Sequence, residues 1–191
     1  MAEYYYLVTS LPFLRYKEPP VLCYKDFIDS CAFWMNKKDL HQVKRARIDI
    51  EKINIEEITN PLLSSWMVFE HSLRNELVRS RAQNMGVQAE NYLRTHINSD
   101  PTVATYVREA VKDPSPYKAE TALIELRWDF LTNNEVGHYF DETSIIIYGL
   151  KLQLLERLSM FKTEKGQKVF HIIYEGNKDE EERKYRENNS N

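Results

Sequence analysis

Apolar side chains recur every three to four residues along most of this chain, a spacing that predicts amphipathic α-helices. The clearest run covers residues 62–85, where Trp66, Phe69, Leu73 and Leu77 would share one face of a helix. Burying these side chains would contribute on the order of 6–12 kcal/mol before conformational entropy is subtracted. The pattern therefore predicts a hydrophobic core built between helices.

Capping and helix-breaking residues set the limits of the predicted helices. Asn60 and Pro61 predict a helix start, because an amide oxygen can cap the first turn and proline fits the first helical position. Gly86 predicts the end of the same helix, since glycine readily takes the left-handed conformation found there. The same reasoning predicts helices over residues 24–35, 37–54, 87–97, 102–111, 117–134, 142–161 and 163–174. The short segment 4–11 fits a strand or a helix, and helix is the interpretation we favour.

No convincing pair of β-strands is predicted, so the expected fold class is all-α. We expect a multi-helix bundle formed by a single helical domain over residues 1–175, with Trp128 and Phe130 in its core. Residues 176–191 carry many charges without apolar periodicity and are expected to form a disordered tail. The five glycines argue against an all-β sandwich or a glycine-rich nucleotide-binding fold.

Composition narrows the functional classes. The net charge of −3 argues against non-specific nucleic-acid binding. No apolar run approaches the roughly 18 residues that a bilayer span needs, and the first residues lack the basic start of a signal peptide. Two cysteines are too few for a disulfide framework. We therefore expect a cytoplasmic protein.

Two patterns raise the question of metal chemistry. Cys23 and Cys31 lack the spacing of metal ligands, so small buried thiols are the favoured interpretation. Glu135 and His138 form a single Glu-x-x-His spacing, whereas helix-bundle di-iron proteins use two such pairs with further glutamates. We assign no metal, cofactor or catalytic residue from these patterns, and we expect His138 to pack at a helix–helix turn.

Two other functions stay open as alternatives. A helical-bundle, metal-dependent enzyme would need Glu70, Glu120, Glu135 and His138 to converge. A nucleic-acid-binding helical adaptor would use the basic residues of segment 37–52, for which a solvated helix face is the favoured interpretation.

The richest polar pattern lies on the helix predicted over 62–85. Glu70 and Arg74 are four residues apart in the order that favours an ion pair, and Glu76 and Arg79 are three apart. The favoured interpretation is an inter-helix polar network that includes Glu70, Asn75, Glu76, Glu120, Arg127 and His138, with Glu125 as a further partner. The other interpretation is a docking surface for a partner protein, with Arg74, Arg79 and Arg81 as anchors.

Five blocks of sequence point to a family. They are the tyrosine-rich start at 4–12, the Leu-Arg-Asn-Glu-Leu-Val-Arg run within 70–82, the segment 119–128 ending in Leu-Arg-Trp, Gly-His-Tyr-Phe-Asp at 137–141, and Leu-Lys-Leu-Gln-Leu-Leu-Glu-Arg at 150–157. Together they resemble an uncharacterised bacterial family, a domain of unknown function. Genes of that family lie among the genes of bacterial V-type ATPases, and in some of these clusters no ordinary C subunit is apparent.

The resemblance implies a role akin to the C subunit of the V-type ATPase, which is called the d subunit in eukaryotes. That component is an all-helical funnel between the central rotor shaft and the membrane ring. A reduced, C-like coupling module and an assembly factor for the complex both fit the resemblance. It implies a non-catalytic protein whose partners are central-stalk and membrane-ring subunits, without nucleic acid, and which reaches the inner membrane only through the complex.

Overall fold

The computed structural model describes residues 4–50, 57–94 and 100–162. Within these ranges the chain forms seven α-helices and no β-strand, which confirms the all-α prediction. The helices are α1 (Tyr5–Ser10), α2 (Tyr24–Trp34), α3 (Lys37–Arg45), α4 (Pro61–Met85), α5 (Pro101–Lys112), α6 (Pro116–Asn133) and α7 (Glu142–Lys162). A 3-10 turn, η3 (Glu90–Tyr92), follows α4.

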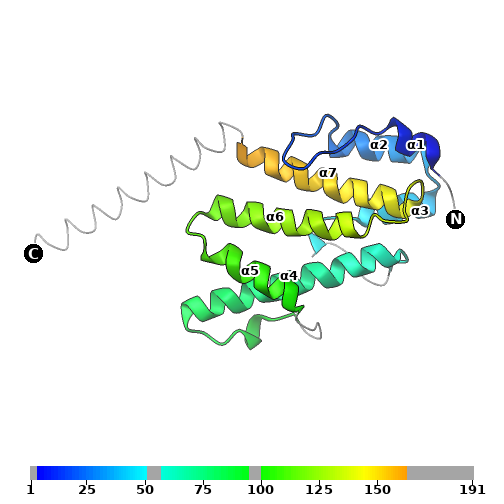
Figure 1. Cartoon of the computed structure of the whole chain (residues 1–191). Helices are drawn as coiled ribbons and strands as arrows, with labels where there is room; N and C mark the ends of the chain where they lie inside the picture. Colours follow the sequence, from blue (N-terminus) through cyan, green and yellow to red (C-terminus); the bar gives the residue numbers. More distant parts are fainter. Residues whose placement is uncertain (1–3, 51–56, 95–99, 163–191) are drawn as a thin grey trace, which may run out of the picture.

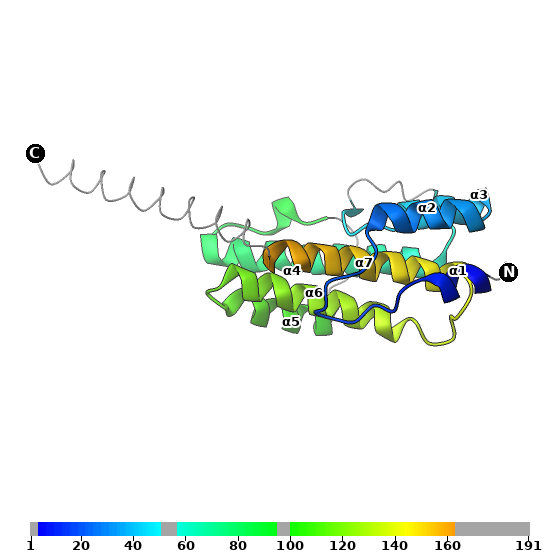
Figure 2. The same cartoon turned by 90° about the horizontal axis from the view of Figure 1, so that it is seen from above.

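Helices α2, α3 and α6 pack on α7. Helix α4 packs on α5, α5 on α6 and α6 on α7, while α2 and α3 also contact α7. Figure 1 shows α7, α6 and α4 as long rods lying one below another, with α5 crossing α4. Figure 2 shows α2 and α3 along one side of α7 and α5 on the opposite side. Helix α7 therefore has neighbouring helices on both sides.

The position of α7 explains why its sequence is apolar almost all the way round. Its buried apolar side chains are Ile145, Ile146, Ile147, Leu150, Leu152, Leu154, Leu155 and Leu158. These residues cover more than one helix face, so α7 is buried on more than one side. No helix in the described ranges is both long and apolar enough to cross a membrane.

The predicted caps of α4 are confirmed. The Asn60 side-chain oxygen accepts hydrogen bonds from the backbone N–H groups of Leu62 and Leu63, and Pro61 occupies the first turn. At the other end, Gly86 has a φ of 67°, the left-handed conformation that favours glycine. Local sequence thus fixes both ends of α4.

The helix predicted over residues 37–54 is wrong in length, since α3 ends at Arg45. Side chains from other helices bind the backbone beyond it and so replace the helical hydrogen bonds. Gln153 donates to the Ala46 carbonyl at 2.8 Å and accepts from the Ile48 N–H at 3.4 Å. Trp66 donates its indole N–H to the next carbonyl, that of Arg47, at 3.2 Å. Residues 51–54 of this prediction lie outside the described residues.

The helix predicted over residues 87–97 is also wrong in its described part. Only the turn η3 forms there, and its Tyr92 side chain is exposed. The Asn75 side chain makes two hydrogen bonds to the backbone of Arg94. It donates to the Arg94 carbonyl at 3.0 Å and accepts from the Arg94 N–H at 2.9 Å. This clamp holds the segment to α4 without a helix. Residues 95–97, the predicted helix 163–174 and the tail 176–191 lie outside the described residues.

A tight contact between α2 and α7 yields the first testable prediction. A Cβ atom added at Gly149 would lie 2.8 Å from Cε1 of the fully buried Phe27 ring. Because the ring cannot move into solvent, Gly149→Ala should lower the free energy of unfolding by about 1–3 kcal/mol, despite the higher helix propensity of alanine. Urea denaturation followed by circular dichroism measures this loss.

A control separates the clash from a general effect on α7. In a Phe27→Leu background, where the ring is gone, Gly149→Ala should cost clearly less than in the wild-type chain. An equal cost in both backgrounds would contradict the proposed contact.

Candidate functional site

The polar centre of the protein is a buried ion pair between α4 and α6. The Glu70 carboxylate is fully buried and receives two hydrogen bonds from Arg127, one from Nε at 2.5 Å and one from Nη2 at 3.1 Å. Arg127 Nη1 also donates to the Leu123 carbonyl at 3.2 Å. Burial alone would lower the pKa of Arg127, but the Glu70 carboxylate outweighs burial and raises it. The Arg127 guanidinium is therefore held in its charged form against the carboxylate inside the core.

Arg74, the first of the three expected anchors, extends this ion pair. Its Nε lies 3.8 Å from the Glu70 carboxylate, one helical turn away. Its Nη2 donates to the Ile48 carbonyl at 3.3 Å and lies 3.9 Å from the Asp49 carboxylate. Only 26% of the Arg74 side chain is exposed. Arg74 therefore ties α4 to the segment that follows α3.

The other two expected anchors differ from each other. Arg79 contacts the Glu76 carboxylate on the same helix, at the spacing noted in the sequence, and is partly exposed. Arg81 is exposed and makes no ion pair with another described residue. Of the three arginines, Arg81 is the one whose charge is open to a partner.

The carboxylates of α6 have other partners than the sequence indicated. Glu120 pairs with Arg157 of α7 at 2.8 Å, and Glu125 lies 3.5 Å from Lys17 in the loop before α2. The expected partners of both carboxylates were polar side chains of α4. The reason for the difference is the order of the helices, because Figure 1 shows α6 between α7 and α4, and Glu120 lies on the side of α6 that meets Arg157 of α7.

Glu135 and His138, the Glu-x-x-His pair, each bind a different partner. Glu135 accepts a hydrogen bond from Lys151 at 2.6 Å, and His138 lies 2.5 Å from the Asp141 carboxylate at the turn into α7. In the described ranges no group of three or more His, Cys, Asp or Glu side chains could hold a metal ion. The convergence of Glu70, Glu120, Glu135 and His138 required by the metal-enzyme alternative is therefore not found there.

The two cysteines have different environments. Cys31 is buried, and burial raises the pKa of its thiol to about 12, so it stays protonated at neutral pH. Cys23 is exposed, which corrects our expectation of two buried thiols. Its Sγ accepts a hydrogen bond from the Asp26 N–H at 3.5 Å and caps α2.

The basic segment after α2 is partly turned inward. Arg45 pairs with Glu57, and the Arg47 guanidinium lies over the Tyr24 ring at 4.7 Å from its centroid. Lys37 and Lys38 are exposed at the start of α3. Arg45 and Arg47 therefore already have partners within the chain.

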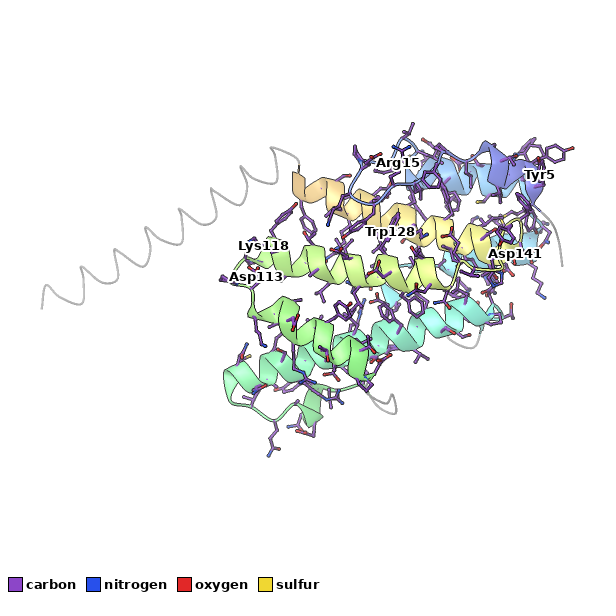
Figure 3. All side chains as sticks on the ribbon, viewed as in Figure 1. Tyr5, Arg15, Asp113, Lys118, Trp128 and Asp141 are labelled. Atoms are coloured by element: carbon purple, nitrogen blue, oxygen red, sulfur yellow. The ribbon has the colours of Figure 1, made fainter. Side chains whose placement is uncertain are left out.

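A feature that the sequence pattern did not predict is a cluster of exposed aromatic side chains at one end of the bundle. The aromatic cluster consists of Tyr5 and Tyr6 of α1, Phe33 and Trp34 of α2, and Phe140 of the loop before α7. Tyr6 stacks on Trp34 with ring centroids 6.0 Å apart, and Phe33 meets the same indole edge to face at 5.1 Å. Tyr5 contacts Phe140 at 5.0 Å. Figure 3 shows Tyr5 projecting outward at the end of the molecule where Asp141 also lies.

The neighbouring Tyr4 holds the aromatic cluster in place from inside. Its hydroxyl donates to the Asp39 carboxylate at 2.6 Å and accepts from Asn36 at 2.8 Å, and its backbone N–H donates to the Phe140 carbonyl at 2.6 Å. Burial and the Asp39 carboxylate raise the pKa of Tyr4 to about 12. The sequence feature that could have indicated the aromatic cluster is the run of three consecutive tyrosines at residues 4–6, because a short helix can bury only some of them.

Comparisons with known protein families, with curated proteins and with solved structures found no match to this chain.

The buried ion pair yields the second prediction. Glu70→Leu leaves the Arg127 charge in the core without its main partner, so it should lower the free energy of unfolding by about 3–5 kcal/mol. The double variant Glu70→Leu/Arg127→Met replaces both charges by apolar groups and should be more stable than Glu70→Leu alone. Urea denaturation of the two variants and of Arg127→Met measures the coupling; strictly additive losses would contradict it.

Proposed function

We propose that this chain is a non-catalytic component of a V-type ATPase. In this proposal it acts as a coupling or assembly component, similar to the C subunit, between the central rotor stalk and the membrane ring. It would lie on the cytoplasmic side and meet the membrane only through the complex. The five resembling sequence blocks are the source of the proposal, and the all-α fold agrees with it.

The observation that supports docking best is the aromatic cluster. Tyrosine and tryptophan are the side chains most often found at the energetic centre of protein interfaces. Here Tyr6 is 71% exposed and Trp34 is 48% exposed, although both are already in contact with each other. Rings that are held before binding lose little conformational entropy when a partner covers them. The cluster therefore suits a lasting protein interface.

A coupling part must also pass on force without deforming, and the contacts between helices suit that task. The ion pair of Glu70 with Arg127 joins α4 to α6, and the pair of Glu120 with Arg157 joins α6 to α7. The buried length of α7 connects these to α2 and α3. Force applied at the aromatic cluster would thus be distributed over the whole bundle.

The test is capture of partners from the native cell. Tagged full-length protein should co-purify with rotor-stalk or membrane-ring subunits, identified by mass spectrometry. Trp34→Ala and Tyr6→Ala should each reduce their recovery about tenfold or more, because a central aromatic anchor is lost. Tyr92 on η3, a tyrosine that is 65% exposed and lies outside the aromatic cluster, provides the matched control, and Tyr92→Ala should leave recovery unchanged.

Two results would count against this function. Recovery of no ATPase component by the wild-type chain would reject it. An equal loss with Tyr92→Ala would show that the aromatic cluster is not the contact surface. Arg81→Glu, tested beside these variants, shows whether the exposed arginine of α4 belongs to the same interface.

A further inference from the structure

A second surface, separate from the aromatic cluster, is a groove where α4, α5 and α6 meet. Its volume is about 810 Å³. The floor is formed by Phe69 of α4 and Phe130 of α6, which stack with centroids 4.3 Å apart. On the rim, Val68 is 56% exposed and Tyr106 of α5 is 55% exposed. Apolar surface thus stays open to solvent along this groove.

The hydroxyl groups beside this floor present acceptors to the groove. Ser64, Ser65 and Thr132 each donate their hydroxyl hydrogen to a backbone carbonyl one turn earlier in their own helix, at 3.4, 3.1 and 2.9 Å. A hydroxyl has one hydrogen to donate but two lone pairs. With the hydrogens used inside the helices, these oxygens can only accept hydrogen bonds from whatever fills the groove.

The charges of the groove have one sign. Asp129 and Asp100 are among the described residues that line it, and none of these is Lys, Arg or His. Asp129 makes no ion pair with a described residue, and its pKa is raised first by burial and then by the Glu125 carboxylate one turn away. One oxygen of Asp100 caps α5 by accepting from the Thr102 and Val103 N–H groups. The described lining of the groove therefore lacks the positive charge that its acceptors would match.

A protein segment fits these features better than a small molecule. Small-ligand sites bury 70–90% or more of their ligand, whereas the rim side chains here are themselves more than half exposed. A helix laid into a groove instead contributes an apolar stripe and flanking charges. Lysine or arginine on such a helix could meet the carboxylates and the Tyr106 ring face.

We propose that the groove between α4, α5 and α6 docks a basic amphipathic helix of another protein. Its apolar side chains would lie on Val68, Phe69 and Phe130, and its Lys or Arg side chains would meet Asp129, Asp100 and the hydroxyl acceptors. The inference goes beyond the proposed function, because this surface is built by helices other than those of the aromatic cluster and holds for any protein partner.

Photo-crosslinking of the full chain in its native cell tests the inference. A photoreactive benzoylphenylalanine at Val68 reports what lies in the groove, and mass spectrometry identifies the crosslinked peptide. We expect a segment with Lys or Arg spaced three to four residues apart. Asp129→Lys should reduce the yield about tenfold or more, because the charge complementarity is reversed. Asp29→Lys, at an exposed position of α2, is the matched control and should leave the yield unchanged.

Each other outcome overturns the inference. The crosslink could give no adduct, adducts to lipid or nucleic acid, or adducts confined to this chain or a second copy. It could also give a segment without Lys or Arg, or a yield that Asp129→Lys leaves unchanged.

Circular dichroism checks that the Asp129→Lys variant is folded. If it is not, Asp129→Asn replaces it, because this variant removes the charge without adding a longer side chain, and the yield should again fall. Failure here is distinct from failure of the proposed function. A basic partner helix from a protein outside the ATPase would uphold the groove and count against the ATPase role.

Discussion

The arrangement of the long helices depends on one buried carboxylate. Glu70 lies in the middle of α4 without solvent, and only a matched guanidinium makes its charge tolerable there. Arg127 supplies two hydrogen bonds from α6, and Arg74 approaches the same carboxylate from α4 itself. A rotation or slide of α6 against α4 would separate these charges inside the core. The ion pair therefore fixes the relative position of the two helices more strictly than apolar packing alone.

The same principle extends to the irregular segment after α3. Three long side chains from two different helices, those of Trp66, Arg74 and Gln153, hold the backbone of residues 46–48. Each supplies a hydrogen bond that a helix would otherwise have provided. Because Arg74 also meets Glu70, the loop and the buried ion pair are parts of one polar network. Arg74 thus has a structural task in this chain, whereas Arg81, further along α4, is exposed.

The aromatic cluster and the groove differ in chemistry. The aromatic cluster carries large rings already packed against one another, and the groove carries an apolar floor flanked by carboxylates and hydroxyl acceptors. They are built by different helices, α1 and α2 for the first and α4, α5 and α6 for the second. A protein with two such surfaces is suited to hold two neighbours at a fixed separation, as a coupling or assembly component would.

Local sequence determined the helical class, the caps of α4 and the burial of α7, because helix periodicity and capping act over a few residues. Even the contacts of Glu70 with Arg74 and of Glu76 with Arg79 follow from spacing alone. The tertiary structure decided that α3 stops at Arg45, that Glu120 meets Arg157, and that Tyr6 stacks on Trp34. Each of these depends on a partner distant in sequence, and spacing along the chain carries no information on which helices become neighbours.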